Sequence, residues 1–345
     1  MVAALPYLLG FHPEESIVLV GLRGHSEVVV TIRGDLPDPA AEPVGGRAMA
    51  AHLARSAVTD GVTHAVVIVV TRAGDPGSLP RRRLAEHTAR ALRGHGLTVL
   101  DQLCVRDGRY WSYTCADRGC CPPEGTVPPP VGGGSVAVGT VAAGRVVLPG
   151  RPALVATLEP ARADPDLERA FGGAGSAQDA LARRRGLAVA AAEGVTAIAA
   201  EVVRRADGGG VLTPGAVASH AVALALPAVR DGCLRWIGGP LSGAAESLWL
   251  ELARRALPAY VAPAATILGM YAYARGDGAF ARVCTDRALK CDPAYALAEL
   301  LNDALDYGIS PPDIVRMANS VVAALAGDGP AGGEPGCQPA SGGDG

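Results

Sequence analysis

The chain has 345 residues, of which 49% are hydrophobic and 19% charged, and this composition excludes wholesale disorder and predicts two domains. Its 31 basic and 34 acidic residues leave a formal charge of −3. We therefore expect no nucleic-acid partner, because general nucleic-acid binders carry a basic surplus that neutralises phosphates. Lys290 is the only lysine. The chain thus has no G-K-[ST] phosphate-binding loop, and a Schiff base could form only at this residue.

No segment has the pattern of a membrane span. The two most hydropathic stretches, 186–203 and 211–229, owe their hydropathy mainly to alanine and contain glutamates or prolines. The N-terminal apolar run follows no basic segment and has no small-residue cleavage site, so no secretory signal is expected. Eight cysteines are too few for a disulfide framework in a chain of this length. We therefore expect a cytoplasmic protein that does not bind membranes.

Residues 1–158 are predicted to form an α/β domain with a layered sheet. Short β-branched runs, typical of strands, alternate with longer runs that have helical spacing. The expected strands are 17–22, 28–33, 64–71, 97–105 and 109–114, and the expected helices are 40–58 and 79–94. The first two strands are typical of a hairpin. A cysteine-containing loop is expected within 104–134, since 122–134 is rich in proline and glycine.

Residues 159–175 contain proline, aspartate and glycine, and are expected to link this domain to a second one. The strand pattern then nearly disappears, and residues 176–326 predict an all-α domain. Its expected helices are 176–206, 214–226, 228–237, 241–257, 263–275, 279–290, 294–307 and 311–326. Residues 327–345 are rich in glycine and proline without periodicity, which predicts a disordered tail.

One interval of the helical domain has the spacing of a tetratricopeptide repeat. When Ala262 is counted as the first position, the characteristic leucine, glycine, alanine and proline positions are occupied by Leu268, Gly269, Ala281, Ala288 and Pro293. The tryptophan and second-helix aromatic positions do not match, and no convincing second copy is present. A tetratricopeptide-like hairpin and an ordinary alanine-rich hairpin therefore remain equal alternatives.

The most distinctive local feature is a cluster of cysteines in the first domain. Cys115, Cys120 and Cys121 lie within seven residues, and Cys104 precedes them by eleven. Thiolates are favoured zinc ligands, so these four residues are candidate ligands of a structural zinc ion. The spacing differs from paired C-x₂-C knuckles, and a redox disulfide from Cys115 to Cys120 or Cys121 is a second interpretation. Reduced thiols in a structural turn are the third, and the sequence leaves all three open.

A second candidate site lies directly before the first expected strand. His12, Glu14, Glu15 and Ser16 place a histidine, two carboxylates and a hydroxyl within five residues. These residue types can serve as general base and nucleophile, so His12, Glu15 and Ser16 are candidate catalytic residues. A turn in which polar side chains cap the backbone explains the same residues, and we favour it.

Three blocks of the sequence are distinctive together: PYLLGFHPEESIVLVGLRG, RYWSYTCADRGCCPPEGT and YARGDGAFARVCTDRALKCDPAYALAELL. In order and spacing they resemble the actinobacterial family known as domain of unknown function 4192, over roughly residues 1–326. The resemblance implies no activity, substrate or cofactor, but it marks the family-pattern residues Gly10, His12, Pro13, Ser16, Trp111, Cys115, Cys120, Cys121, Gly276, Asp277 and Gly278. The family pattern begins with a short segment before the first block. Only Met1–Leu5 precede the block here, so we expect an earlier start site or a missing edge element.

These features favour a non-enzymatic interaction or regulatory protein. Stacked helical pairs form grooves that bind peptides, so a protein or peptide partner of the helical domain is expected. One alternative is an enzyme with a site at the sheet edge that uses His12, Glu15 and Ser16. Another is a thiol-based zinc or redox sensor. No G-x-G-x-x-G follows a strand and no G-x-S-x-G is present, so neither a dinucleotide cofactor nor a hydrolase elbow is expected.

Overall fold

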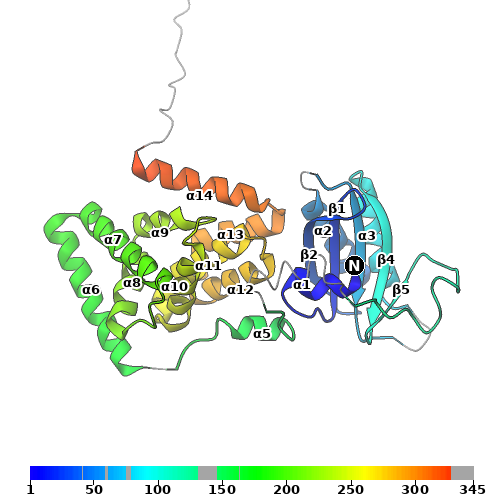
Figure 1. The fold of residues 1–345 in the computed structure, drawn as a ribbon, viewed down its shortest axis with the longest axis horizontal. Coiled ribbons are helices and arrows are strands. Elements are labelled where there is room, and N and C mark those ends of the chain that lie inside the picture. Colours follow the sequence, from blue (N-terminus) through cyan, green and yellow to red (C-terminus); the bar gives the residue numbers. More distant parts are fainter. Residues whose placement is uncertain (41, 59–60, 75–78, 131–145, 163, 328–345) are drawn as a thin grey trace, which may run out of the picture.

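The computed structural model describes residues 1–40, 42–58, 61–74, 79–130, 146–162 and 164–327. A five-stranded mixed sheet is followed by a mostly helical part, as the change in periodicity predicted (Figure 1). The strands are β1 (Ser16–Arg23), β2 (Glu27–Asp35), β3 (His64–Val70), β4 (Thr98–Arg106) and β5 (Arg109–Ser112). Among the described helices, none combines the length and the hydropathy that crossing a membrane requires.

The strands of the sheet follow the order β2-β1-β3-β4-β5. β1 is antiparallel to β2 and β3, β3 is parallel to β4, and β5 returns antiparallel to β4. The predicted hairpin is therefore confirmed, with Ser16 opposite Asp35. Because β2, β3 and β4 share one direction, their carboxyl ends meet at one edge of the sheet, where β1 begins. Open α/β sheets commonly bind ligands at this edge.

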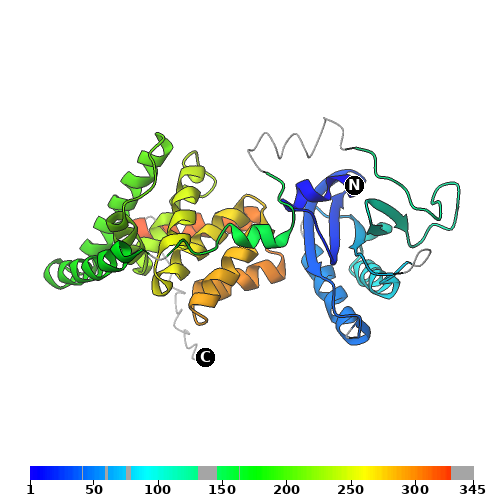
Figure 2. The same ribbon diagram turned by 90° about the horizontal axis from the view of Figure 1, so that it is seen from below.

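Helices cover both faces of this sheet. α2 (Glu42–Ala57) and α3 (Arg82–Gly94) pack on one face, where Leu53 and Leu84 join Val67 in a buried cluster (Figure 2). α1 (Leu5–Leu9) and α5 (Arg151–Ala156) contribute to a second cluster, which includes residues of the other face of the sheet. β3 is buried on both faces, as its β-branched run predicted.

The helical half surrounds one central helix, α11 (Val261–Ala274). All but two residues of α11 are buried, as expected for a helix that is apolar on all sides. Its neighbours include α8, α10, α12, α13 and α14. The helices of this half besides α11 are α6 (Pro165–Arg185), α7 (Leu187–Ala206), α8 (Pro214–Leu224), α9 (Pro227–Gly232), α10 (Ser242–Arg255), α12 (Gly278–Cys291), α13 (Ala296–Tyr307) and α14 (Pro311–Ala326).

The two largest differences from the sequence-based boundaries concern the expected linker and the helix that follows it. The expected linker 159–175 overlaps α6, which begins at Pro165 because the Asp164 carboxylate accepts from the backbone N–H of Asp166 and caps the helix. The expected single helix 176–206 is divided at Gly186, whose φ of 89° separates α6 from α7. The expected tail lies outside the described residues beyond Gly327.

A group of ion pairs joins α7 to α10. The carboxylate of Glu251 accepts from Arg205, from Arg255 at 2.5 Å and from the backbone N–H of Leu212 at 3.0 Å. Arg205 also pairs with Glu201 at 3.0 Å. Burial alone would raise the pKa of Glu251, but the hydrogen bonds from the two arginines and Leu212 hold this pKa below its ordinary value. The group therefore links the two helices through charged partners that water hardly reaches.

Few polar contacts join the two halves of the chain. Ser56 Oγ, at the end of α2, donates to the carbonyl oxygen of Asp306 at 2.8 Å. Gly308 lies against the same serine, because a Cβ at this position would be 2.6 Å from the carbonyl oxygen of Ser56. Arg151 pairs with Asp286 at 3.2 Å. These contacts place the end of α2 beside the end of α13, and the start of α5 beside the middle of α12.

Candidate metal centre

The cysteine-containing loop follows β5 and lies at the end of the molecule away from the helical half (Figures 1 and 2). Its base is closed by backbone hydrogen bonds in both directions between Tyr110 and Thr126, each 2.9 Å long. The indole Nε1 of Trp111 donates to the carbonyl oxygen of Pro123 at 2.9 Å. The loop is therefore anchored along β5 on both of its arms.

Gly125 lies in contact with the indole of Trp111. Its φ is +78°, and a Cβ at this position would be 2.4 Å from Cζ2 of the indole. Arg109 donates to the carbonyl oxygen of this glycine at 2.9 Å. Only glycine permits both the backbone conformation and the close approach. The contact of Gly125 with Trp111 was not predicted from the sequence, although a glycine within the segment PPEGT indicates a tight turn there.

Short hydrogen-bonded turns bring the three loop cysteines together. The backbone N–H of Cys115 donates to Ser112 Oγ at 3.2 Å, and this hydroxyl donates to the Asp101 carboxylate at 2.7 Å. The backbone N–H of Cys121 donates to the carbonyl oxygen of Asp117 at 2.7 Å. The start of the segment 115–121 is thus held by the end of β5, and a hydrogen bond within the segment turns it back on itself.

The thiol sulfurs of Cys115, Cys120 and Cys121 all lie within 4.8 Å of one another. Zinc in tetrahedral coordination, with Zn–S bonds of about 2.3 Å, needs sulfurs roughly 3.8 Å apart, so a small inward movement would close the group around an ion. Cys120 is exposed and the other two are half-buried. Hydrogen bonds with the thiols of Cys115 and Cys120 raise the pKa of Cys121 to about 11. A metal must therefore displace a proton from Cys121 at neutral pH.

Cys104, the fourth ligand expected from the sequence, does not join this group. Its side chain is 1% exposed and packs in the core between the sheet and helices α2 and α3. Burial raises the pKa of its thiol, against which the phenol of Tyr113 lies. The alternation of β4 directs Cys104 into this core, whereas the other three cysteines follow the end of β5. The structure therefore brings together three of the four expected cysteines.

Glu15, directly before β1, is hydrogen-bonded to the residues that follow β3. Its carboxylate accepts from Thr71 Oγ1 at 3.0 Å and from the backbone N–H of Arg72 at 2.6 Å. These bonds hold Glu15 at a φ of 36°, which is strained for a side chain other than glycine. These hydrogen bonds give the Glu15 carboxylate a structural role in this turn, and this role accounts for the residue without catalysis.

Ser16 and His12 are likewise not arranged as a nucleophile and its base. Ser16 is fully buried, and its hydroxyl donates to the carbonyl oxygen of Glu14 at 2.5 Å and accepts from Arg33 Nε at 2.9 Å. His12 is exposed, and its backbone N–H donates to the carbonyl oxygen of Leu148. Among these described residues, no hydrogen bond joins the imidazole of His12 to Glu15 or Ser16.

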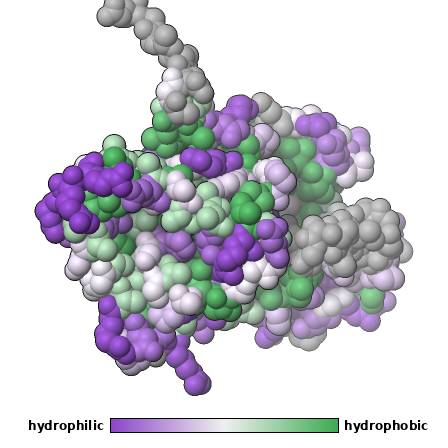
Figure 3. Space-filling model, turned by 60° about the vertical axis from the view of Figure 1, so that its left-hand side comes forward, coloured by the Kyte–Doolittle hydropathy of each residue, from purple (hydrophilic) through white to green (hydrophobic). Residues whose placement is uncertain are grey.

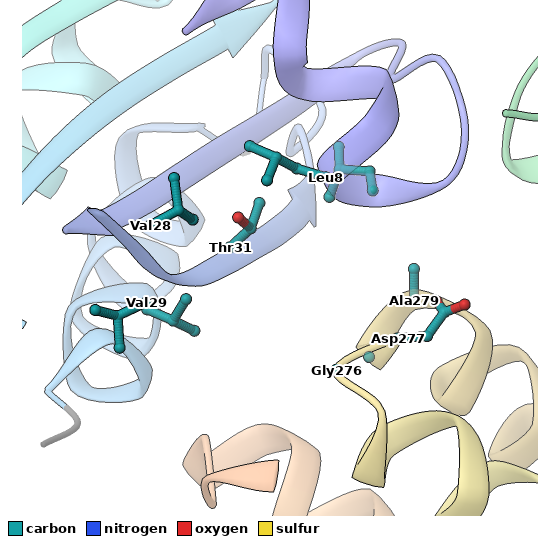
Figure 4. A pocket seen from close by; sticks show the side chains of 10 residues that line it. Leu8, Val28, Val29, Thr31, Gly276, Asp277 and Ala279 are labelled. Carbon is teal, nitrogen blue, oxygen red and sulfur yellow. The ribbon is translucent and has the colours of Figure 1, made fainter. Parts of the chain in front are cut away.

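A pocket of about 180 Å³ lies between the two halves (Figure 4). It is lined by residues 28–31 of β2, by Leu8 and Leu9 of α1, and by residues 276–279 at the start of α12. Neither His12 nor the loop cysteines line this pocket. This pocket therefore belongs to neither of the two candidate sites that the sequence predicted.

Comparison with known proteins gives one match. A family model described as Domain of unknown function (DUF4192) matches residues 1–312. No curated protein and no solved structure matches the chain. The residues of the family pattern lie at three places in the fold: the turn that leads into β1 with its first residue, β5 with the cysteine loop, and the start of α12.

Proposed function

Because the chain belongs to the family described as Domain of unknown function (DUF4192), which assigns no activity, we propose a function from its thiol loop: a metal-binding regulatory protein that takes up one zinc ion. Its ligands are Cys115, Cys120 and Cys121, and the convergence of their sulfurs within 4.8 Å carries the proposal. Thiolates select thiophilic metals such as zinc over magnesium or calcium. The proposal takes the protein to be cytoplasmic, where reducing conditions keep thiols free to bind metal.

Zinc binding acts on the exposed end of the loop. The arms are fastened to β5, whereas the tip around Cys120 is held by bonds within the segment 115–121. An ion that crosslinks three thiolates orders this tip and presents a rigid surface beside an edge strand. A partner that recognises this ordered surface binds the protein only when zinc is bound, and this dependence would be the regulation.

Metal content measured by mass spectrometry tests the proposal, on protein purified without chelator or metal-affinity resin, together with a count of free thiols. We expect one equivalent of zinc in the unmodified protein. Cys120→Ser and Cys121→Ser each remove a ligand and lose the metal. Cys291→Ser is the matched control, because Cys291 is also half-buried but lies in α12, and this variant retains the zinc.

Two other outcomes overturn the zinc proposal. Absence of metal with two thiols missing from the count identifies a disulfide and a redox role. Absence of metal with all eight thiols free identifies a structural turn.

We further propose that the helical half binds a protein partner, as a second candidate role. An apolar stripe on α14 supports it: Met317, Val321 and Leu325 recur every fourth residue and are 58%, 38% and 50% exposed. Apolar side chains gather on this helix in Figure 3. Residues 328–345 contain no large apolar residue that could cover the stripe. A second copy of the chain is the simplest partner, because two such stripes complement each other across a two-fold axis.

The tetratricopeptide-like interpretation belongs to the same proposal. Gly269 lets α11 and α12 approach closely, since a Cβ there would be 3.2 Å from Cβ of Cys284. Ala281 and Ala288, at the small-residue positions of the repeat, are fully buried. However, α11 is enclosed by its neighbours, unlike the helices that line the concave face of an open repeat array. We therefore assign the partner surface to α14.

Sedimentation velocity tests this second role. We expect the unmodified chain to shift from monomer to dimer as its concentration rises, and the double variant Met317→Lys, Val321→Lys to remain monomeric. Ser320→Lys adds a charge to the same helix beside the stripe and leaves the dimer intact. An unmodified chain that stays monomeric throughout contradicts the dimer.

A further inference from the structure

We infer that zinc bound by Cys115, Cys120 and Cys121 keeps its fourth coordination position on the solvent side, where it accepts an external thiolate. This inference rests on the zinc-binding proposal and names the ligand class of the same site. The described residues bring together three ligands only, since no other histidine, cysteine, aspartate or glutamate of the described chain joins the group. Zinc with three protein ligands holds a water or another exchangeable ligand at its fourth position.

The two acidic side chains that take part in the hydrogen bonds of the cysteine loop, Asp117 and Asp101, already have partners. The carboxylate of Asp117 accepts from the backbone N–H of Gly119 at 2.8 Å. The carboxylate of Asp101 accepts from Ser112 Oγ and from the backbone N–H of Gln102, each at 2.7 Å. These bonds stabilise the turns that bring the cysteines together. If Asp117 or Asp101 gave up these hydrogen bonds to bind zinc, the turns that hold the three cysteines together would be weakened.

The rest of the sequence offers few alternatives. Residues 131–145, which follow the loop after a few residues, contain no cysteine, histidine, aspartate or glutamate. Outside the described residues the sequence has one further cysteine, Cys337, and no histidine. Closure of the site by a thiolate or imidazole from those parts of the chain would therefore have to use Cys337, which makes this residue the decisive one to replace.

The exposed side of the cluster favours an external thiolate. Cys120 and the residues 116–119 are exposed, so the face of the ion on the side of Cys120 meets water. The complex of zinc with three thiolates has a net charge of −1. This charge makes the ion a weaker acid toward its bound water, so exchange of the water for another ligand is favoured over hydrolysis by a zinc-bound hydroxide. An incoming thiol releases its proton to solvent and displaces the water. The complex then carries a charge of −2, and Arg118 is an exposed cation of the same loop.

Cobalt(II) in place of zinc provides the test, because its sulfur-to-metal charge-transfer absorption reports the number of bound thiolates. The full-length chain, kept reduced with a phosphine, is loaded with one equivalent of cobalt and titrated with 2-mercaptoethanol. We expect the charge-transfer absorption to rise by about one third and then saturate, as three thiolates become four. Cys337→Ser and Cys291→Ser are expected to respond in the same way.

The outcomes separate this inference from the proposal it rests on. If no cobalt binds, the zinc-binding proposal fails. If cobalt binds with the spectrum of four thiolates and 2-mercaptoethanol changes nothing, the site is closed and only the present inference fails. A response that appears only in Cys337→Ser identifies Cys337 as the closing ligand and also overturns it. A spectrum of three thiolates that 2-mercaptoethanol leaves unchanged shows that the position does not accept a thiolate.

Discussion

Glu251→Gln is expected to lower the free energy of unfolding by about 3 kcal/mol, because the ion-pair group between α7 and α10 is largely buried. The side chains of Arg205 and Glu251 are 8% and 12% exposed, so removal of the carboxylate charge leaves Arg255 without its ion-pair partner and Arg205 with Glu201 alone, in surroundings that solvate neither guanidinium well. The amide oxygen of glutamine still accepts from the backbone N–H of Leu212, so the loss falls on the hydrogen bonds and charge that the two arginines share with the carboxylate. Urea unfolding followed by circular dichroism measures the change.

Glu193→Gln is the matched control for that experiment. Its carboxylate pairs with Arg185 at 2.5 Å, but the two side chains are 48% and 61% exposed. Water and salt screen such a pair, so its loss changes the stability by less than about 0.5 kcal/mol. Equal unfolding midpoints for the two variants would show that the pairs around Glu251 contribute no more than a surface contact.

Gly125→Ala is expected to weaken metal binding by about tenfold, because overpacking of this kind costs about 1–3 kcal/mol. The added Cβ meets the indole of Trp111 at 2.4 Å and pushes one arm of the loop away from β5. The thiols are then held in a less suitable arrangement before the metal binds. Competition with a chromophoric chelator measures the affinity, and Trp111 fluorescence reports the displaced arm without metal.

Gly108→Ala separates this contact from backbone strain. Gly108 lies in the turn between β4 and β5 with a φ of +73°, close to the +78° of Gly125, but its added Cβ meets nothing within 4 Å. Both variants therefore carry similar strain, and only one disturbs Trp111. If the two bind metal equally well, the anchoring of the loop by Trp111 does not position the thiols.

The sequence predicted the elements that bury a continuous apolar pattern. The β-branched run of β3 and the long helices α2, α3 and α10 to α14 satisfy this condition. The short helices α1 and α5, with five and six residues, are too short for periodicity to show and were not expected. Local sequence patterns do not determine the order of the strands either. β1 lies between β2 and β3 because the connection through α2 crosses over β1 before β3 joins the sheet.

The candidate site could be predicted only in part, for a similar reason. The spacing of Cys115, Cys120 and Cys121 showed that three thiols are close in sequence, and a tight turn keeps them close in space. Cys104 was included because eleven residues can return to the same point, yet a strand carries it into the core instead. Ligand convergence depends on the direction of side chains, which spacing alone does not determine.

The anchored loop also affects how the sheet ends. An unpaired edge strand is a template for intermolecular sheet extension and aggregation. At β5 the outward backbone groups of Tyr110 are already satisfied by Thr126, so the returning arm of the loop occupies the edge that another chain would use. At the opposite end of the sheet, β2 lies across a narrow pocket from the start of α12. Release of the loop would therefore leave β5 as an unpaired edge strand, which is the kind of template from which intermolecular sheet extension starts.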